Sequence, residues 1–291
     1  MKPNRIIVPL IFLIFAVISF LTNILGPLVP DIINSFNLSI GLAGFLPFSF
    51  FVAYGVMSIP SGILMEKYSE KKVLIAAFVL AFAAALVFAV FTTFTTALLS
   101  LFSIGIGMAM LQVVINPLLR HTGGEEHFAF NSVMANFFFG AASFLSPLLY
   151  SAMVANIHST DNSNPIILFF NNLVTAELKW VSLYWVFAVT CVIMIVVIAF
   201  IKFPKVELKA DEKIDIGSSF KELLRNRNVL LYFIGIFCYV GTEQGIANWM
   251  SKFLQLYHGV DPATGGGYRY FVFLGFDNRW LFPWTWLIKT V

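Results

Sequence analysis

Long apolar stretches separated by short polar segments run through most of the chain. Seven of them exceed the roughly 18 mostly apolar residues that a helix needs to cross a bilayer. They lie at residues 6–29, 42–65, 73–95, 97–119, 130–155, 181–201 and 229–251. The first is too long, and too closely followed by the second, to be a cleaved secretory signal. The pattern therefore predicts an all-α membrane protein that crosses the bilayer several times.

Composition supports this prediction and narrows the chemistry. Hydrophobic residues make up 59% of the chain and charged residues 11%, against about 25% charged residues in soluble domains. The sequence has no Walker A motif and no recognisable set of nucleophile, base and orienting group. Its four histidines and two cysteines show no metal-ligand spacing. We therefore expect no enzyme, no metal or cofactor site and no nucleic-acid partner.

Basic residues gather between alternate apolar stretches. The first groups are Lys2 and Arg5, then Lys67, Lys71 and Lys72, then Arg120, and a further seven lie from Lys202 to Arg227. The intervening loops hold only Lys179 and Lys252. Because cytoplasmic loops carry the excess of Lys and Arg, we expect the N-terminus and the basic loops to be cytoplasmic. The expected location is a bacterial inner (plasma) membrane.

The polar segments divide the chain into four parts. Residues 1–203 are expected to form a six-helix transmembrane bundle, and residues 204–227 a cytoplasmic linker with a short amphipathic helix near Phe220 to Leu224. Residues 228–264 hold the seventh helix and an outer loop. Residues 265–291 are interrupted by Arg, Asp and Asn and rich in Trp, and indicate either a frameshifted or truncated product or an aromatic interfacial anchor. In the earlier outer loop 156–178, "PIILFF" is too short to span and is expected at the interface.

The loop after the second apolar stretch carries a charged motif, "GILMEKYSEKK". It resembles the cytoplasmic loop signature of the major facilitator superfamily at Gly62, Leu64, Glu66, Lys67 and Lys71, whereas Ser69 and Glu70 depart from it. We expect Gly62 to permit close helix packing, and Glu66, Lys67 and Lys71 to belong to a loop that rearranges during a conformational switch. The alternative is a generic charge cluster that anchors the helix end.

The fourth stretch contains two amides, Gln112 and Asn116, spaced to lie on one face of a helix. Asn116 precedes Pro117, whose missing N–H leaves a backbone carbonyl free. Since each amide both donates and accepts hydrogen bonds, this face suits a hydroxyl-rich ligand. The alternative is that the amides bind neighbouring helices.

The seventh stretch, "FCYVGTEQGIANWM", places Glu243 within an apolar run. A carboxylate at bilayer depth costs roughly 2.5–3.5 kcal/mol and normally faces the bundle interior or a wet cavity. Tyr239 lies four residues earlier, Gln244 and Asn248 form a polar pair, and Gly241 and Gly245 indicate a close helix contact. The hypothesis is that Glu243 lines a substrate path and carries a proton. The alternative is a structural carboxylate.

Together, "PSGILMEK", "LQVVINPLLR", "LSPLL" and "FCYVGTEQGIANW" resemble the fucose/glucose-galactose permease family of the major facilitator superfamily, over residues 5 to about 264. The resemblance implies proton-coupled sugar symport by two six-helix bundles, and a chain holding the first bundle plus the first one or two helices of the second. The expected substrate contacts are Asn23, Gln112, Asn116, Tyr239, Gln244 and Asn248, and the expected coupling residue is Glu243. Of these, Asn23, Asn116, Tyr239 and Glu243 are the ones that the resemblance retains. Gly26 and Gln112 stand where fucose permeases carry carboxylates.

Two functions remain open. The first is a secondary active transporter of a neutral sugar, a hexose or deoxyhexose, with protons and the lipid bilayer as its other partners. Because alternating access needs two bundles, this product is expected to be inactive alone. The second is a non-transporting truncated membrane protein or a half-transporter that needs a second chain to complete the bundle.

Overall fold

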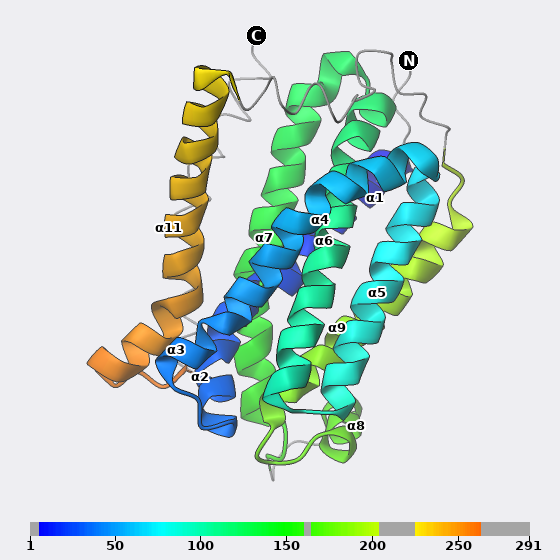
Figure 1. The fold of residues 1–291 in the computed structure, drawn as a ribbon. Coiled ribbons are helices and arrows are strands. Elements are labelled where there is room, and N and C mark those ends of the chain that lie inside the picture. The colour runs from blue at the N-terminus through cyan, green and yellow to red at the C-terminus, as the bar shows by residue number, and fades with distance from the viewer. Residues whose placement is uncertain (1–5, 160–163, 204–224, 263–291) are drawn as a thin grey trace.

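The computed structural model describes residues 6–159, 164–203 and 225–262, and these residues form a bundle of long helices (Figure 1). The helices are α1 (Ile7–Asn23), α2 (Leu25–Ser35), α3 (Ile40–Ala43), α4 (Phe45–Lys67), α5 (Glu70–Val90), α6 (Phe94–Gly123), α7 (Phe128–Asn156), α8 (Pro165–Leu173), α9 (Ser182–Phe200) and α11 (Arg227–His258). Short 3₁₀ turns, η1 (Glu125–His127) and η2 (Lys179–Val181), precede α7 and α9.

Seven membrane-spanning candidates are present among the described residues, as the apolar pattern predicts. They are Ile7–Ser35, Ile40–Met65, Glu70–Val90, Phe94–Gly123, Glu125–Asn156, Lys179–Phe200 and Arg227–His258. The "PIILFF" segment forms the short helix α8, whose start is capped by the side chain of Asn164. The expected amphipathic helix near Phe220 to Leu224, most of the linker and the tail lie outside the described residues.

The first span is broken at Ile24 and is longer than the sequence predicts. Pro27 has no N–H to donate to the Asn23 carbonyl, so the helical ladder is interrupted there. It resumes where the Leu28 N–H donates to the Ile24 carbonyl at 3.3 Å. The expected end at residue 29 is wrong, because α2 continues to Ser35 and takes Asp31 into the span.

Helix α6 lies at the centre of one side of the bundle, against α4 and α5. A Cβ at Gly105 would lie 2.4 Å from the Phe50 carbonyl oxygen of α4, and one at Gly107 would lie 2.9 Å from the Ala77 carbonyl oxygen of α5. Glycine is therefore required at both contacts, because it lets helix backbones approach closely. The close packing expected at Gly62, Gly241 and Gly245 is not formed, since a Cβ at each meets no described atom within 4 Å.

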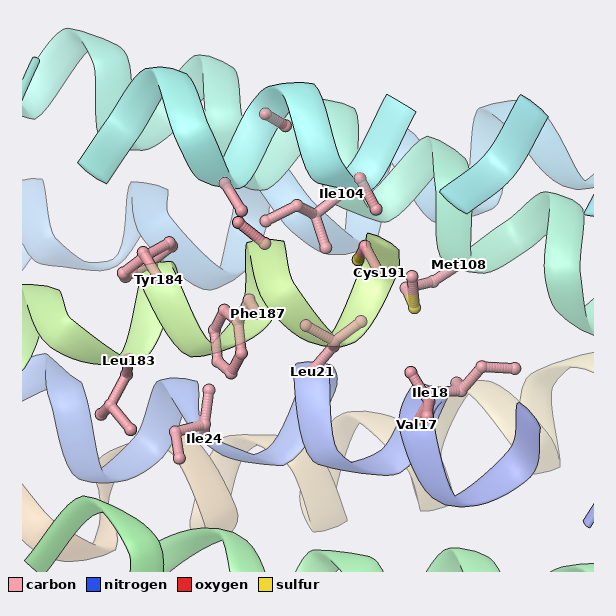
Figure 2. Packing of buried hydrophobic residues seen from close by; sticks show 14 of the residues in the cluster. Val17, Ile18, Leu21, Ile24, Ile104, Met108, Leu183, Tyr184, Phe187 and Cys191 are labelled. Atoms are coloured by element: carbon pink, nitrogen blue, oxygen red, sulfur yellow. The ribbon is translucent and has the colours of Figure 1, made fainter. Parts of the chain in front are cut away.

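The core between α1, α6 and α9 is almost wholly apolar. Figure 2 shows Tyr184, Phe187 and Cys191 of α9 between the α1 side chains and those of α6. Phe187 also meets Phe20 of α1 edge to face, with ring centroids 5.3 Å apart. This packing, together with contacts of α1 with α7 and of α5 with α9, joins the first six spans into one bundle.

Helix α11 stands beside this bundle and touches it at one end, where its main packing partner is α2 (Figure 1). Its buried residues are all in its C-terminal half: Ala247, Asn248, Ser251, Lys252 and Leu254. The N-terminal half is largely exposed. The expectation that Lys252 lies in a loop is wrong. Its charged end donates to the Gln255 side chain at 2.7 Å, so this lysine is tolerated inside the helix with 7% exposure.

Candidate functional site

Gln112 of α6 is held by a tyrosine from a neighbouring helix. Tyr54 of α4 donates its hydroxyl hydrogen to the Gln112 side-chain oxygen. This bond fixes which way the amide faces, since the oxygen must point at Tyr54. The Gln112 amide nitrogen, a donor of two hydrogen bonds, makes none to the described residues. The pair therefore presents an oriented donor for a ligand.

Asn116 lies one turn further along α6 and is exposed. Its amide nitrogen donates to the Gln112 backbone carbonyl at 3.1 Å. The prediction that the two amides share one helix face is confirmed by this contact. Gln112 and Asn116 thus form a small polar patch on α6 beside Pro117, which lies inside the helix.

Asn23 is buried at the break between α1 and α2. Its amide nitrogen donates to the Ser19 carbonyl and to the Ser19 hydroxyl, both at 3.1 Å. These bonds hold the side chain against its own helix. A substrate contact at Asn23 stays a prediction.

The polar residues of α11 differ in burial along the helix. Tyr239 is 62% exposed, Glu243 and Gln244 are half-buried, and Asn248 is 7% exposed. The Asn248 amide donates to the Gln244 carbonyl at 2.8 Å. Glu243 therefore lies at the transition between the exposed and the docked half of the helix, and the described residues cover only part of its side chain.

The charged motif spans the end of α4 and the start of α5, and its main contact is made by Lys71 in the first turn of α5. Lys71 Nζ donates to the carbonyl oxygens of Ala199 at 2.6 Å and Ile201 at 2.9 Å, at the C-terminal end of α9. Lys67 is exposed, with its Nζ 5.7 Å from the Tyr68 ring centroid. Gly62 is half-buried, and the side chain of Glu66 lies outside what is described. The loop thus connects α5 to the end of the sixth span.

A groove of about 530 Å³ lies between α1 and α7. Its lining, from Ala16 to Phe20 on α1 and from Ala142 to Ala152 on α7, is apolar. Such a lining offers almost no hydrogen bonds to hydroxyl groups, whose burial without partners is costly. The polar patch on α6 is therefore the better site for a hydroxyl-rich ligand.

Two candidate functional residues, Asp31 and Tyr150, were not predicted from the sequence. Asp31 of α2 accepts a hydrogen bond from the Tyr150 hydroxyl of α7, with 2.6 Å between the oxygens. Tyr150 is fully buried. Asp31 thus lies near the end of the first span, Ile7–Ser35, in addition to Glu243 in the seventh. The apolar residues that follow Asp31, Ile32 and Ile33, are the signal that the first span continues past Pro30.

Two proteins with similar sequences are both named as sugar transporters. A glucose/galactose transporter of Brucella abortus biovar 1 (strain 9-941) is 26% identical over 258 residues, covering 87% of this chain and 58% of that protein. An L-fucose-proton symporter of Escherichia coli (strain K12) is 27% identical over 259 residues, covering 84% and 57%. This chain therefore spans less than two thirds of the length of these relatives.

Solved structures share the fold. The transporter FucP in its outward conformation matches with a TM-score of 0.71 and 23% identity, covering 99% of this chain and 72% of that chain. An inward-facing bacterial homologue of the human lysosomal transporter Spinster matches with a TM-score of 0.76 and 15% identity, covering 92% and 58%. The described helices are thus a six-helix bundle of this fold followed by the first helix of the second bundle.

The sequence profile described as the Major Facilitator Superfamily matches residues 11–290, which is nearly the whole chain. This match agrees with the helical fold, with the seven spans and with the relatives named above. The chain belongs to the Major Facilitator Superfamily.

Proposed function

We propose that the protein is a secondary active transporter, not an enzyme, and that it moves a neutral hexose or deoxyhexose together with protons. The observation that carries the proposal is the Gln112 amide, oriented by Tyr54 within a membrane-spanning bundle. Hydroxyl-rich ligands need such fixed donors, since each group must be satisfied when it leaves water. The names of the relatives, glucose/galactose transporter and L-fucose-proton symporter, favour a sugar and a proton.

Glu243 is the proposed coupling residue on α11, with Tyr239, Gln244 and Asn248 contributing to the substrate path. Its half-buried place between the exposed and docked halves of the helix supports this role. A carboxylate there can exchange a proton with water while remaining within a span. Asn23 and Asn116 are the remaining proposed sugar contacts.

The proposed arrangement has residues 1–203 as the first bundle, 204–227 as a cytoplasmic linker and 228–264 as the start of the second bundle. The protein lies in a bacterial inner membrane with its N-terminus in the cytoplasm. The Lys and Arg bias of the loops supports this orientation. In this arrangement the loop of Gly62, Glu66, Lys67 and Lys71 is cytoplasmic and moves during transport.

A half-transporter that needs a second chain is the other candidate. The exposed N-terminal half of α11 and the apolar groove between α1 and α7 support it, because both offer surfaces that further helices can cover. A chain that supplies the rest of the second bundle is the proposed partner.

The test is sugar exchange by the purified 291-residue chain in proteoliposomes. Vesicles loaded with unlabelled glucose, galactose or fucose are placed in trace radiolabelled sugar, with and without a proton gradient. The proposal requires exchange of one sugar class, and accumulation with the gradient, by this chain alone or together with a chain that supplies the rest of the second bundle. Gln112→Ala is expected to weaken sugar affinity by about tenfold, because one or two hydrogen bonds of roughly 1 kcal/mol each are lost.

Ser103→Ala is the matched control on α6, since that hydroxyl donates to the Leu99 carbonyl of its own helix. Its exchange should equal that of the unaltered chain. Exchange that appears only when the rest of the second bundle is co-expressed establishes the half-transporter. If neither preparation exchanges any of the three sugars, the assignment to sugar transport is wrong.

A further inference from the structure

We propose that Asp31 is a second proton-binding residue, positioned by Tyr150, and that its charge decides whether the C-terminal half of α11 stays docked on α2. The inference rests on the proposed function in one respect, which is that the docking step belongs to a transport cycle. The docking step itself involves no sugar and can be measured without one.

Asp31 lies where three parts of the fold meet. Its own helix, α2, packs against α7 and α11. The Tyr150 hydroxyl of α7 donates to Asp31 Oδ2 at 2.6 Å, which joins two positions that are 119 residues apart in sequence. This short bond fixes the carboxylate at the junction, and a hydrogen bond to an ionised acceptor is roughly twice as strong as a neutral one.

The docked half of α11 packs against α2 and lies close to the start of α4. Ser251 is fully buried, and its hydroxyl has no hydrogen-bond partner among the described residues. A Cβ at Gly44 would lie 3.9 Å from the Trp249 ring, so this tryptophan lies against the start of α4. Docking therefore buries a polar group that water would otherwise satisfy, and a modest repulsion suffices to oppose it.

A like charge supplies that repulsion. Asp261 lies three residues after the end of α11, the helix that packs against α2, so its negative charge is brought toward Asp31 when α11 is docked. The other charged or titratable groups lie on α11 and on η2: Arg227, Tyr232, Cys238, Tyr239, Glu243, Lys252, Tyr257 and His258 of α11 and Lys179 of η2. The described residues of α7 add only Tyr150. Lys252 donates within its own helix to Gln255. The described residues of α1 and α3 contain no titratable side chain.

The charge state of Asp31 then sets the docking equilibrium. When a proton passes from water to the Asp31 carboxylate, no other bond forms or breaks, and the repulsion from Asp261 ends. The C-terminal half of α11 then docks on α2. When Asp31 loses the proton, the like charges of Asp31 and Asp261 repel each other and the docked state is disfavoured. Proton binding thereby favours the contact between α11 and α2.

The test is thiol labelling of a cysteine placed in the docked surface. Ser251→Cys is made together with Cys238→Ser, and the rate of maleimide labelling is measured from about pH 5 to about pH 8, where buried carboxylates titrate. The unaltered chain provides the reference rate, because Cys238 is exposed on the N-terminal half of the same helix and Cys191 is buried. The ratio of the two rates removes the pH dependence of the thiol chemistry itself.

We expect the ratio to rise with pH by about fivefold, because ionisation of Asp31 introduces one like-charge contact worth about 1 kcal/mol in water. Asp31→Asn should keep the ratio low at every pH, and Asp261→Asn should flatten the rise while leaving α2 unaltered. Tyr150→Phe should move the midpoint to higher pH, because the ionised carboxylate loses its donor. Glu177→Gln, an exposed carboxylate in the loop before η2, is the control that should change nothing.

A ratio that is independent of pH in the Ser251→Cys chain overturns the proposal. So does a pH-dependent ratio that survives both Asp31→Asn and Asp261→Asn. These outcomes are separate from those of the sugar-exchange assay, since labelling needs neither sugar nor transport. A normal labelling response without sugar exchange retains the Asp31 switch and rejects sugar transport.

Discussion

Two tyrosines anchor polar side chains between helices of the bundle. Tyr54 binds Gln112, and Tyr150 binds Asp31, each across two different helices. A tyrosine suits this role because its ring packs among apolar side chains while its hydroxyl serves as a single donor. Both bonds leave the partner with further hydrogen-bonding capacity, which a ligand or a proton can use.

Tyr54→Phe tests this role at Gln112. The ring stays, but the amide is free to turn, so we expect sugar affinity to fall about fivefold, the effect of losing roughly 1 kcal/mol of hydrogen bonding. The maximal exchange rate should change little. The measurement is exchange as a function of sugar concentration in proteoliposomes.

Tyr257→Phe is the control for the same chemical change, because Tyr257 is 74% exposed near the end of α11. Equal losses in the two variants would show that Tyr54 does not position the amide.

Some features of the candidate site could be predicted from the sequence and others could not. The spacing of Gln112 and Asn116 predicted their shared face, because helical neighbours follow from sequence separation alone. The partners Tyr54 and Tyr150 did not follow, since they lie 58 and 119 residues from the groups that they bind. Asp31 was missed for another reason. A charge after a proline is typical of a helix end, and only the bond to Tyr150 explains its place inside a span.

At the scale of elements, Lys71 connects two helix ends. Its ammonium group, near the start of α5, donates to two carbonyls at the end of α9. The last carbonyls of a helix have no partner within the helix, and a cation there also complements the helix dipole. Lys71 therefore fixes the place where the chain leaves the sixth span.

Lys71→Met should loosen the end of α9 while keeping most of the side-chain length. We expect faster amide hydrogen exchange in residues 196–203, on the order of twofold to fivefold, for an interaction of roughly 0.3–1 kcal/mol. Mass spectrometry of the purified protein measures this. Lys72→Met is the matched control, because Lys72 is exposed. An unchanged rate in the Lys71 variant would mean that the two hydrogen bonds do not hold the helix end.

The number of membrane-spanning helices was predicted better than the residues at which these helices begin and end. Apolar length alone indicates how many helices cross a membrane, and the seven stretches correspond to seven candidates. The observed helix ends differ from the predicted ones because a helix can include a polar residue whose side chain is hydrogen-bonded. Lys252, which donates to the Gln255 side chain, is an example. The break at Ile24 depends on the position of Pro27, which has no N–H to donate to the carbonyl four residues earlier. The close contact expected from Gly241 and Gly245 is absent from the described structure, whereas Gly105 and Gly107 form such contacts.

At the scale of the whole molecule, α11 is held at one end. Its C-terminal half contributes all of its buried residues, and its main partner is α2. The stability of the docked arrangement should therefore depend on that half alone. Removing the same number of atoms from each half provides a direct comparison.

Leu254→Ala and Leu231→Ala form this comparison, with side chains that are 8% and 57% exposed. We expect Leu254→Ala to lower the free energy of unfolding by about 2 kcal/mol or more, the usual cost of truncating a buried leucine. Leu231→Ala should have little effect. Thermal unfolding in detergent measures both, and equal losses would contradict a helix held only at its C-terminal half.

The order in which the helices find their partners differs across the bundle. The two glycine contacts of α6 are with α4 and α5, which leave the ribosome just before it. These three helices can thus assemble during synthesis. Helix α1 must wait for its main partner α7, which begins at Phe128. Until then its apolar side chains face lipid at little cost, because acyl chains are as apolar as the leucines and isoleucines that replace them. Lipid therefore solvates the first helix until α7 has been synthesised.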